Sequence, residues 1–182
     1  MSWSLDELAS AVADSDADAF EALFERLREP LFRYVRELAP SGDGYDVLQD
    51  VFLKLWEVRS RLEVRVGIKP LLYRMARNRA LNMTRKLKRI RLPGDLPDSG
   101  QSPEGSTVEL NELQEQIQDW IGQLPPRRAE AFLLSRFHEL PHADIARIMN
   151  LSVRTVQTHI VHALKDLRAA RARWEATGRG PQ

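Results

Sequence analysis

The apolar residues of this chain recur at intervals of three and four, and nowhere do they alternate with polar residues over a useful length. This period is that of an amphipathic helix with one buried face. One such stripe in the first half of the chain consists of Phe20, Leu23, Phe24, Leu27, Leu31, Tyr34, Val35 and Leu38. We therefore predict an all-α fold.

A segment rich in Pro, Gly, Ser and Asp interrupts the helical pattern near the middle of the chain. It reads LPGDLPDSGQSPEGS over 92–106 and contains only two leucines as apolar residues. Such a composition favours an extended connector over a helix or a strand. The chain of 182 residues is therefore predicted to form two helical domains, 1–91 and 110–182, joined by a flexible acidic linker at 92–109.

The net charge of +1 conceals strongly segregated charges. Residues 64–91 carry ten basic side chains and no acidic one, whereas residues 92–119 carry seven acidic side chains and no basic one. A block of one sign is often only a solvated face, although such a face normally mixes the two signs, so these blocks need a further explanation from the motifs inside them. The chain also has no cysteine, which excludes disulfides, a thiolate nucleophile, a zinc knuckle and an iron–sulfur site.

The chain shows neither a secretion signal nor a membrane segment. Its start, MSWSLDEL, is acidic, and no stretch approaches the roughly 18 to 20 apolar residues that a bilayer span requires. We predict a cytoplasmic protein without membrane insertion.

Local signals place four helices in the first domain. The pairs Ser4 with Glu7 and Ser15 with Asp18 have the spacing of capping boxes, so we expect a short helix before the long one, which Pro30 should kink. After a turn at 40–44, a third helix is marked by Val47, Leu48, Val51, Phe52, Leu55 and Trp56. The fourth is expected to start at Pro70 and to run to about Arg91.

The fourth expected helix carries a stripe of basic and amide side chains opposite a narrow apolar seam. The stripe falls at positions i, i+4, i+8, i+11 and i+15 and consists of Arg74, Asn78, Asn82, Arg85 and Arg89. Arg and Asn are suited to phosphates and to base edges. Because acids are absent from this region, we interpret the stripe as a nucleic-acid surface.

The second domain contains the spacing of a helix-turn-helix. A short helix at 142–149 would end at Asn150 in the left-handed conformation, and Ser152 would cap the next helix. On that helix the residues expected to face inward are Val153, Val156, Ile160, Leu164 and Leu167. Those left outward, where they could enter a major groove, are Arg154, Thr155, Gln157, Thr158, His159 and His162.

Taken together, these segments resemble bacterial sigma factors of the extracytoplasmic-function (ECF) type. The resemblance rests on DxxQDVFLKLW at 46–56, LYRMARNRAL at 72–81, LPHADIA at 140–146 and SVRTV at 152–156. It implies two domains, sigma region 2 and sigma region 4, in a transcription initiation factor that is not an enzyme. It also implies binding to the clamp helices and flap of core RNA polymerase and to the minus-ten and minus-thirty-five elements of promoter DNA.

The resemblance assigns roles to individual residues of the first domain. Polymerase docking falls on Asp46, Gln49, Asp50, Leu53, Lys54 and Trp56. Minus-ten recognition falls on the loop 59–69 and on the stripe Arg74, Asn78, Asn82, Arg85 and Arg89. Two positions depart from the family pattern: Leu71 stands where Trp is usual, and Asn82 where Asp is frequent. Loss of that aromatic residue removes a platform on which an unpaired base could stack.

In the second domain the resemblance assigns the minus-thirty-five element to the outward side of the recognition helix. Arg154 is the first choice for a guanine edge and Gln157 for an adenine edge. Where the family usually has basic residues, this chain has His159 and His162. A metal site at the four histidines is disfavoured because there is neither a His-Glu-x-x-His helix nor any cysteine, and no cofactor is predicted.

Other classes of function remain as alternatives. A LuxR-type helix-turn-helix regulator that is not a polymerase subunit explains only the last third of the chain. A helical hydrolase lacks a Gly-rich phosphate loop and a Gly-x-Ser-x-Gly motif. A protein-binding adaptor leaves both nucleic-acid surfaces unexplained. Within the sigma factors, the runs FLLSR at 132–136 and TVxxHI at 155–160 lean toward the iron-uptake type, and an anti-sigma factor is an expected partner.

Overall fold

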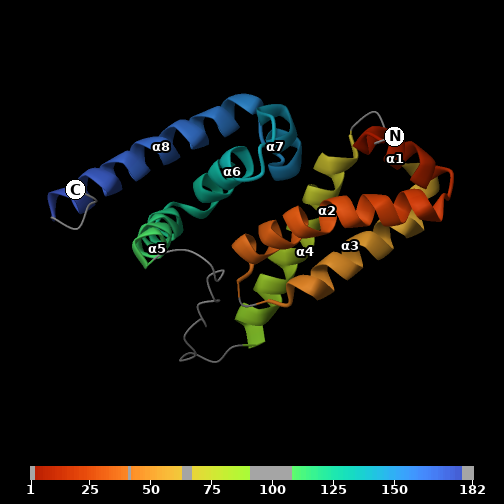
Figure 1. Ribbon diagram of the computed structural model, residues 1–182, viewed down its shortest axis with the longest axis horizontal. Helices are drawn as coiled ribbons and strands as arrows, with labels where there is room; N and C mark the ends of the chain where they lie inside the picture. Colours follow the sequence, from red (N-terminus) through yellow and green to blue (C-terminus); the bar gives the residue numbers. More distant parts are fainter. Residues whose placement is uncertain (1–2, 41, 63–66, 91–107, 178–182) are drawn as a thin grey trace. The chain divides into compact units, whose positions relative to one another are not determined.

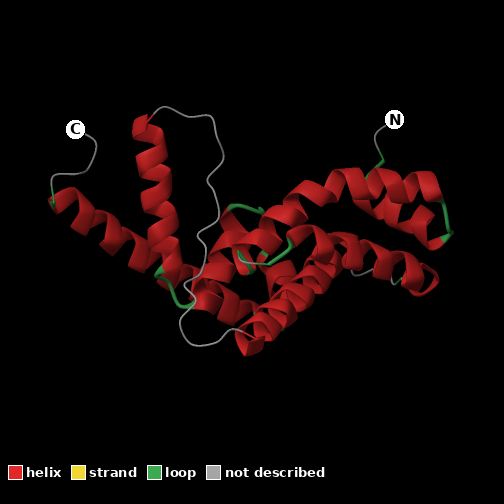
Figure 2. Ribbon diagram, turned by 90° about the horizontal axis from the view of Figure 1, so that it is seen from below, coloured by secondary structure: helices red, strands yellow, loops and turns green. Residues whose placement is uncertain are grey.

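The computed structural model of the protein describes residues 3–40, 42–62, 67–90 and 108–177. In these residues all regular structure is helical, with eight α-helices and one short 3-10 helix (Figure 1, Figure 2). The chain divides into two compact units, Met1–Gly100 and Gln101–Gln182. The predicted all-α fold with two helical parts is confirmed.

The first unit contains helices α1 (Leu5–Ala13), α2 (Ala17–Leu38), α3 (Gly44–Val58) and α4 (Ile68–Ile90), with the 3-10 helix η1 (Arg59–Arg61) between the last two. Helix α2 packs against α1, α3 and α4, and α3 also packs against α4. The predicted stripe on α2 supplies the centre of this core, because Leu23, Leu31 and Val35 are completely buried. The rings of Phe24 and Phe52 meet edge-on between α2 and α3, with centroids 4.8 Å apart, and extend this core.

Helix α1 begins with the predicted capping box. The backbone N–H of Ser4 donates to Glu7 Oε2 at 2.6 Å, and the N–H of Glu7 donates to Ser4 Oγ at 3.2 Å. Hydrogen bonding to the Glu7 carboxyl, first from the backbone N–H of Ser4 and then from the Ser4 side chain, holds the pKa of Glu7 below its ordinary value, because it favours the ionised form.

The second predicted capping box, Ser15 with Asp18, is wrong by one residue. Asp16 is the N-cap of α2 and accepts a hydrogen bond from the N–H of Ala19 at 3.0 Å. Ser15 instead ends α1, with a φ of 69° in the left-handed region. Both residue types can cap a helix, and the end of α1 decides which of them is placed to do so.

Proline occupies two instructive places in the first unit. Pro30 lies inside α2, which continues as one helix across it. Helix α4 starts at Ile68, two residues before the expected first position at Pro70. The N–H groups of a first helical turn have no partner inside the helix, so proline is tolerated at any of these positions and does not fix which residue comes first.

The two largest fully buried side chains of the described residues lie where α2 meets α4. The rings of Tyr34 and Tyr73 lie 5.1 Å apart between these helices, and both side chains are almost completely buried. Burial raises the pKa of the Tyr73 hydroxyl far above its ordinary value, because the phenolate would be desolvated. Because one side of α4 packs against α2 in this way, its opposite side faces solvent.

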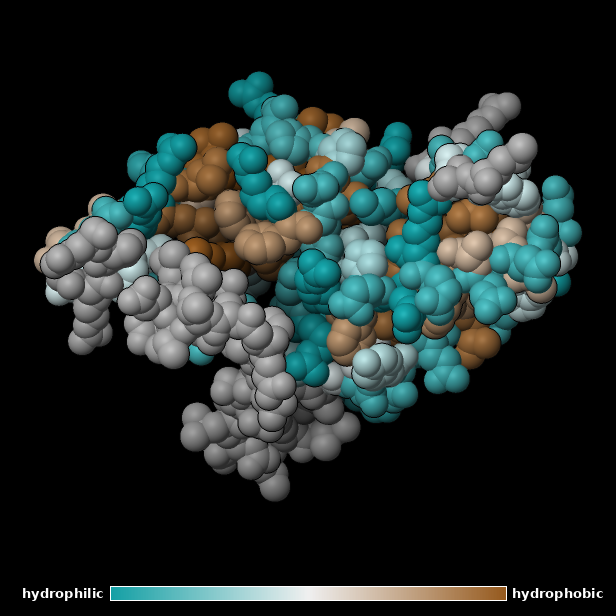
Figure 3. Space-filling view, in the orientation of Figure 1, coloured by the Kyte–Doolittle hydropathy of each residue, from teal (hydrophilic) through white to brown (hydrophobic). Residues whose placement is uncertain are grey.

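The second unit consists of α5 (Val108–Gly122), α6 (Pro126–Arg136), α7 (His142–Met149) and α8 (Val153–Ala176). Val108 and Glu109, which we expected in the linker, are the first residues of α5, and the rest of the predicted linker 92–109 lies outside the described residues. Hydrophobic side chains gather along the seam between α8 and α6 (Figure 3). Near the end of α8, Trp174 meets Trp120 of α5 edge-on at 5.8 Å.

Among the described helices, none has the length and apolar character that crossing a membrane requires.

Candidate polymerase and nucleic-acid interfaces

Helix α3 presents an exposed edge on the side opposite its buried residues. Five of the six residues predicted to dock on polymerase lie on this edge and are exposed: Asp46, Gln49, Asp50, Leu53 and Lys54. Leu53 is unusual for a leucine because 56% of it is exposed. Lys54 Nζ lies 2.9 Å from Glu57 Oε2, so one ion pair along α3 orients part of the edge. An exposed leucine flanked by paired charges is suited to a protein partner.

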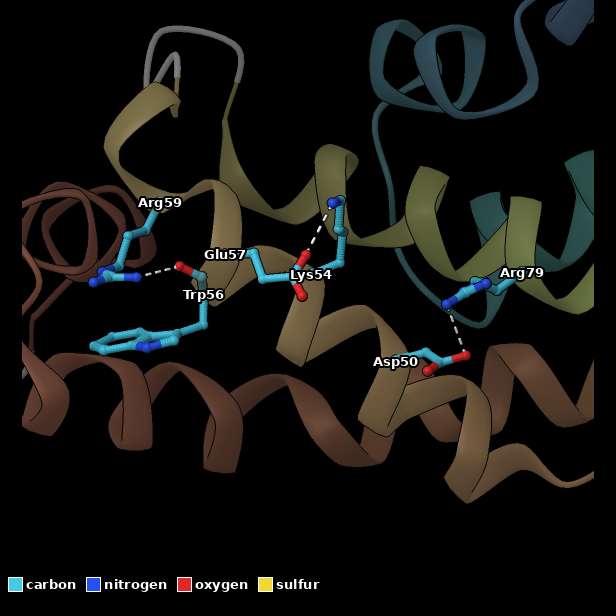
Figure 4. Close-up of polar contacts among 6 residues, drawn as sticks. All are labelled: Asp50, Lys54, Trp56, Glu57, Arg59 and Arg79. Carbon is cyan, nitrogen blue, oxygen red and sulfur yellow. Dashed lines mark hydrogen bonds and ion pairs between the residues drawn. The ribbon is translucent and has the colours of Figure 1, made fainter.

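The edge of α3 borders a groove shared with α4. An ion pair links the two helices, with Arg79 Nη2 lying 2.9 Å from Asp50 Oδ2 (Figure 4). The groove has a volume of about 480 Å³, and its walls include Leu53 from α3 and Met75 and Asn78 from α4. Asn78 belongs to the predicted nucleic-acid stripe, so the predicted docking residues and that stripe meet in this groove. Sequence reasoning missed Arg79, because nothing in a single sequence pairs it with Asp50.

Trp56, the sixth predicted docking residue, is half-buried. Its ring lies edge-on to Phe20 of α2, with centroids 5.0 Å apart, and the Arg59 guanidinium covers it at 4.1 Å from the ring centroid. The structure thus gives Trp56 a packing role inside the first unit. Its contact with polymerase stays a prediction.

The stripe predicted on α4 is exposed wherever the structure describes its side chains. Arg74, Asn78, Asn82 and Arg85 are all exposed, whereas Leu72, Ala76 and Ala80 on the opposite side are completely buried. The side chain of Arg89 lies outside the described residues. Small alanines in the seam let α4 lie close to the core while its long polar side chains face solvent. Guanidinium and amide donors therefore line one side of α4.

Only part of the loop predicted to read the minus-ten element is described. It begins in η1, where Arg61 is exposed, and it resumes at Gly67, whose φ of 78° places it in the left-handed region. Leu71, which replaces the usual aromatic residue, is half-buried on α4. The predicted loop residues 63–66 lie outside the described residues.

The helix-turn-helix of the second unit forms as predicted. Helix α7 has the predicted bounds, and Asn150 follows it in the left-handed conformation, with a φ of 53° and a ψ of 56°. Ser152 Oγ then accepts a hydrogen bond from the N–H of Thr155 at 3.0 Å and caps α8. Ile145 is completely buried and Ala146 is buried, so the turn is fixed against the core.

Most outward residues predicted on α8 are exposed. Arg154, Gln157, Thr158 and His162 are exposed, whereas Thr155 and His159 are half-buried. The Thr155 hydroxyl lies 2.7 Å from that of Ser152, and the Thr158 hydroxyl donates to the Arg154 carbonyl at 3.0 Å. Both hydroxyls are therefore partly engaged within the protein.

The expectation that Val153 faces inward is wrong. Val153 is 43% exposed and Val161 is 63% exposed, so two valines lie among the outward polar residues of α8. Val153 is the first residue of α8 and therefore precedes the turn that meets the core, which begins with the completely buried Val156. An exposed valine on such a surface can contact the methyl group of thymine.

The histidines of α8 differ in their surroundings. The pKa of His159 is held below its ordinary value, chiefly because partial burial disfavours the charged ring and also because Arg128, Arg127 and His162 repel its charge. Arg128 pairs with Asp166 of α8. In the described residues no three His, Cys, Asp or Glu side chains form a group that could hold a metal ion.

The chain matches two models of known protein families, one in each unit. Residues 23–90 match the family described as sigma-70 region 2, and residues 114–167 match the family described as sigma-70, region 4. The chain belongs to the sigma-70 family, in its ECF branch. The family consists of non-catalytic transcription initiation factors that bind core RNA polymerase. The match to region 2 disfavours the LuxR-type alternative, because that class accounts for the second unit alone.

Two curated relatives share most of their length with this sigma factor. The ECF RNA polymerase sigma factor SigK of Mycobacterium sp. (strain JLS) is 24% identical over 172 residues, which are 90% of this chain and 89% of the relative. The ECF RNA polymerase sigma-E factor of Escherichia coli (strain K12) is 28% identical over 168 residues, which are 86% and 88% of the two chains.

A solved structure shares the fold of this sigma factor. The chain is similar to CnrH, whose structure was solved in complex with the cytosolic domain of CnrY, with a TM-score of 0.69 and 22% sequence identity. The match covers 91% of this chain and 95% of that one. This likeness supports the helical fold.

Proposed function

We propose that this sigma factor directs core RNA polymerase to promoters by recognising a minus-ten element with the first unit and a minus-thirty-five element with the second. The exposed edge of α3 docks on the clamp helices of polymerase, the stripe on α4 contacts the minus-ten element, and α8 enters the major groove at the minus-thirty-five element. The second unit also meets the flap. Because bacterial transcription takes place in the cytoplasm, we assign the protein to that compartment.

The observation that carries this proposal is that the α4 stripe is exposed, whereas Leu72, Ala76 and Ala80 on the opposite side of the helix are completely buried. Arg74, Asn78, Asn82 and Arg85 are exposed over three turns, and no acidic residue lies in the sequence between Glu63 and Asp95. A surface of Arg and Asn without acids is suited to the phosphates and base edges of DNA. The capped helix-turn-helix in the second unit supplies the second DNA surface.

An anti-sigma factor is the further partner that we propose. CnrH was solved with the cytosolic domain of CnrY, and a second structural neighbour, sigma factor RpoE, was solved with the anti-sigma factor NepR from Bartonella quintana. The groove between α3 and α4 and the exposed Leu53 offer a surface on which a protein partner could compete with polymerase.

Run-off transcription with core polymerase from the source organism and a fragmented genomic library tests the proposed function. We expect a set of transcription starts that appear only when this chain is added and that share elements near minus-ten and minus-thirty-five. Starts without a shared sequence, or no new starts, would contradict promoter recognition.

A docking variant tests the role of α3 separately. Asp50→Arg should lower the affinity for core polymerase while leaving thermal stability nearly unchanged, because the half-exposed ion pair with Arg79 is worth at most about 1 kcal/mol. Glu25→Arg is the matched control, because it also breaks one exposed ion pair, with Arg28 on α2. Equal core affinities of the two folded variants would remove Asp50 from the interface.

A further inference from the structure

Arg59 joins three parts of the first unit at the point where α3 passes into η1. Its Nε donates a hydrogen bond to Ser15 Oγ at 2.9 Å, and its Nη1 donates to the backbone carbonyl of Trp56 at 2.6 Å. The guanidinium also lies over the Trp56 ring, 4.1 Å from its centroid (Figure 4). These contacts use the Nε and Nη1 donors of Arg59 within the protein.

Ser15, the distant partner of Arg59, holds a backbone conformation that favours glycine. The N–H of Ser15 donates to the Val12 carbonyl at 2.9 Å, and that of Asp16 donates to the Ala11 carbonyl at 3.0 Å. This pair of bonds is a Schellman motif, and its left-handed position, here Ser15 with a φ of 69°, is usually glycine. A serine there is strained. Its hydroxyl has a use that glycine cannot supply, because it accepts the hydrogen bond from Arg59.

Trp56 links this contact to the core of the first unit. Its ring meets Phe20 of α2 edge-on at 5.0 Å, and Phe20 in turn meets Phe52 at 6.1 Å. Arg59 therefore lies on a fixed ring and is tied at its far side to the turn between α1 and α2. The turn, the core and the start of η1 are held together by one side chain.

The segment that follows Arg59 belongs to the loop 59–69, which the family resemblance assigns, together with the α4 stripe, to the minus-ten element. The N–H of Leu62 donates to the Arg59 carbonyl at 3.2 Å, so the first described residues of the loop are folded onto Arg59 itself. We propose that Arg59 is a positioning residue: with Ser15 and Trp56 it sets where the minus-ten loop leaves α3, and it does not contact DNA. This inference rests on the proposed function and changes the role that the sequence assigned to Arg59.

A direct contact with a DNA phosphate is the competing role for Arg59, and the chemistry of lysine separates the two. Lysine keeps the positive charge that a phosphate needs but lacks the planar guanidinium with its Nε and Nη1 donors. A phosphate contact would largely survive Arg59→Lys and would not involve Ser15. A positioning role would be lost in Arg59→Lys and would also be lost when the Ser15 hydroxyl is removed.

The test is a double-mutant cycle in run-off transcription from a duplex promoter with core polymerase. The chains are the wild type, Ser15→Gly, Arg59→Ala, Arg59→Lys and the double variant Ser15→Gly/Arg59→Ala. Arg28→Ala, whose arginine pairs with Glu25 on α2, is the matched control. Core affinity and thermal unfolding are measured for each chain, so that a loss of docking or folding is seen separately.

We expect each single variant of the cycle, and Arg59→Lys, to lower transcription about threefold to tenfold, the range that one hydrogen bond corresponds to. The double variant should transcribe as well as the less active of the two single variants. Ser15→Gly removes only the hydrogen bond between Ser15 and Arg59, which Arg59→Ala has already removed. Ser15→Gly should unfold at the same or a higher temperature, because glycine relieves the strained φ. The affinity of every variant for core polymerase should equal that of the wild type, and the Arg28→Ala control should also transcribe as well as the wild type.

Three outcomes would overturn the inference. They are an Arg59→Lys variant that transcribes as well as the wild type, losses that add in the double variant, and equal yields from all chains while the wild type transcribes. No transcripts from the wild-type chain would overturn the proposed function and this inference with it.

Discussion

Helices α4 and α8 are of nearly equal length, 23 and 24 residues, and each is proposed to contact DNA, yet their exposed sides differ in kind. The exposed side of α4 repeats guanidinium and amide groups along the helix. The exposed side of α8 combines Arg154 and Gln157 with exposed valines and a histidine in the N-terminal half of the helix. These are Val153, Val161 and His162. The difference indicates a long, permanently charged track on α4 and a compact, chemically varied reading surface on α8.

The largest expected effects test whether these two surfaces belong to parts that fold separately. Ile145 behind α8 and Leu72 on the seam of α4 are both completely buried. Ile145→Ala and Leu72→Ala should each lower the free energy of unfolding by about 2 to 5 kcal/mol, because each leaves a cavity. Calorimetry of the full chain should show a different transition shifting in each variant. A shift of both transitions in both variants would mean that the units are energetically coupled.

The next effect separates phosphate contacts from base contacts on α4. Asn78→Ala or Asn82→Ala should change which minus-ten sequences work, by about 1 to 3 kcal/mol of discrimination if the amide contacts a base. Arg85→Ala should instead weaken binding to all sequences alike and reduce the salt dependence. Transcription from a library of minus-ten variants at several salt concentrations measures both. The same profile for the Asn and Arg variants would remove the distinction.

A smaller effect concerns the N-terminal cap of α8. Ser152→Ala removes the acceptor for the Thr155 N–H and should cost about 1 kcal/mol of stability in the second unit. Binding to minus-thirty-five DNA should weaken in parallel, because Arg154 and Gln157 lie within the first two turns. Ser152→Asn is the control, since asparagine caps a helix about as well. Thermal unfolding and fluorescence anisotropy with a minus-thirty-five duplex give the two values, and equal stability of Ser152→Ala and wild type would contradict the role of the cap.

The smallest effect uses the fact that all four histidines lie in the second unit. The folded-state pKa of His159 is lowered, so its contribution to stability is present above the ordinary value near 6.5 and is lost as the pH falls below it. The second unit should therefore unfold at a lower temperature at about pH 5.5 than at about pH 7.5, and His159→Gln should flatten this dependence. The first unit is the internal control because it has no histidine.

The pH dependence of DNA binding should run in the opposite direction. A protonated imidazole attracts phosphate, so binding of the intact protein to a minus-thirty-five duplex should tighten as the pH is lowered if His162 contacts the backbone. His162→Arg should remove much of this dependence and strengthen binding near neutrality. Contacts made by α4 should stay independent of pH in the same titration. A flat profile for the wild-type chain would exclude a phosphate contact by His162.

Sequence reasoning succeeded where a local rule decides the structure. The bounds of α7, the left-handed Asn150 and the cap at Ser152 follow from residue types within a few positions of one another. The exposed stripe on α4 follows from its period in the same way. Each of these features needs no knowledge of what packs against it.

It failed where distant residues decide. Ser15 was expected to cap α2, but the end of α1 and the contact from Arg59, 44 residues away in sequence, give it another place. The ion pair of Asp50 with Arg79 joins two helices and has no signature in either of them. Val153 was placed inward by its period, although the first residue of a helix can lie beyond the core. Tertiary contacts of this kind require the structure.

The edge-on contact of Trp120 with Trp174 has an optical consequence. The chain has four tryptophans, and this pair lies wholly within the second unit, between its first and last helices. Two indoles 5.8 Å apart couple their excited states, so the near-ultraviolet circular dichroism of the protein contains a signal that depends on their relative orientation. The end of α8 therefore carries an intrinsic chromophore, which would report any movement of that helix against α5 without an attached label.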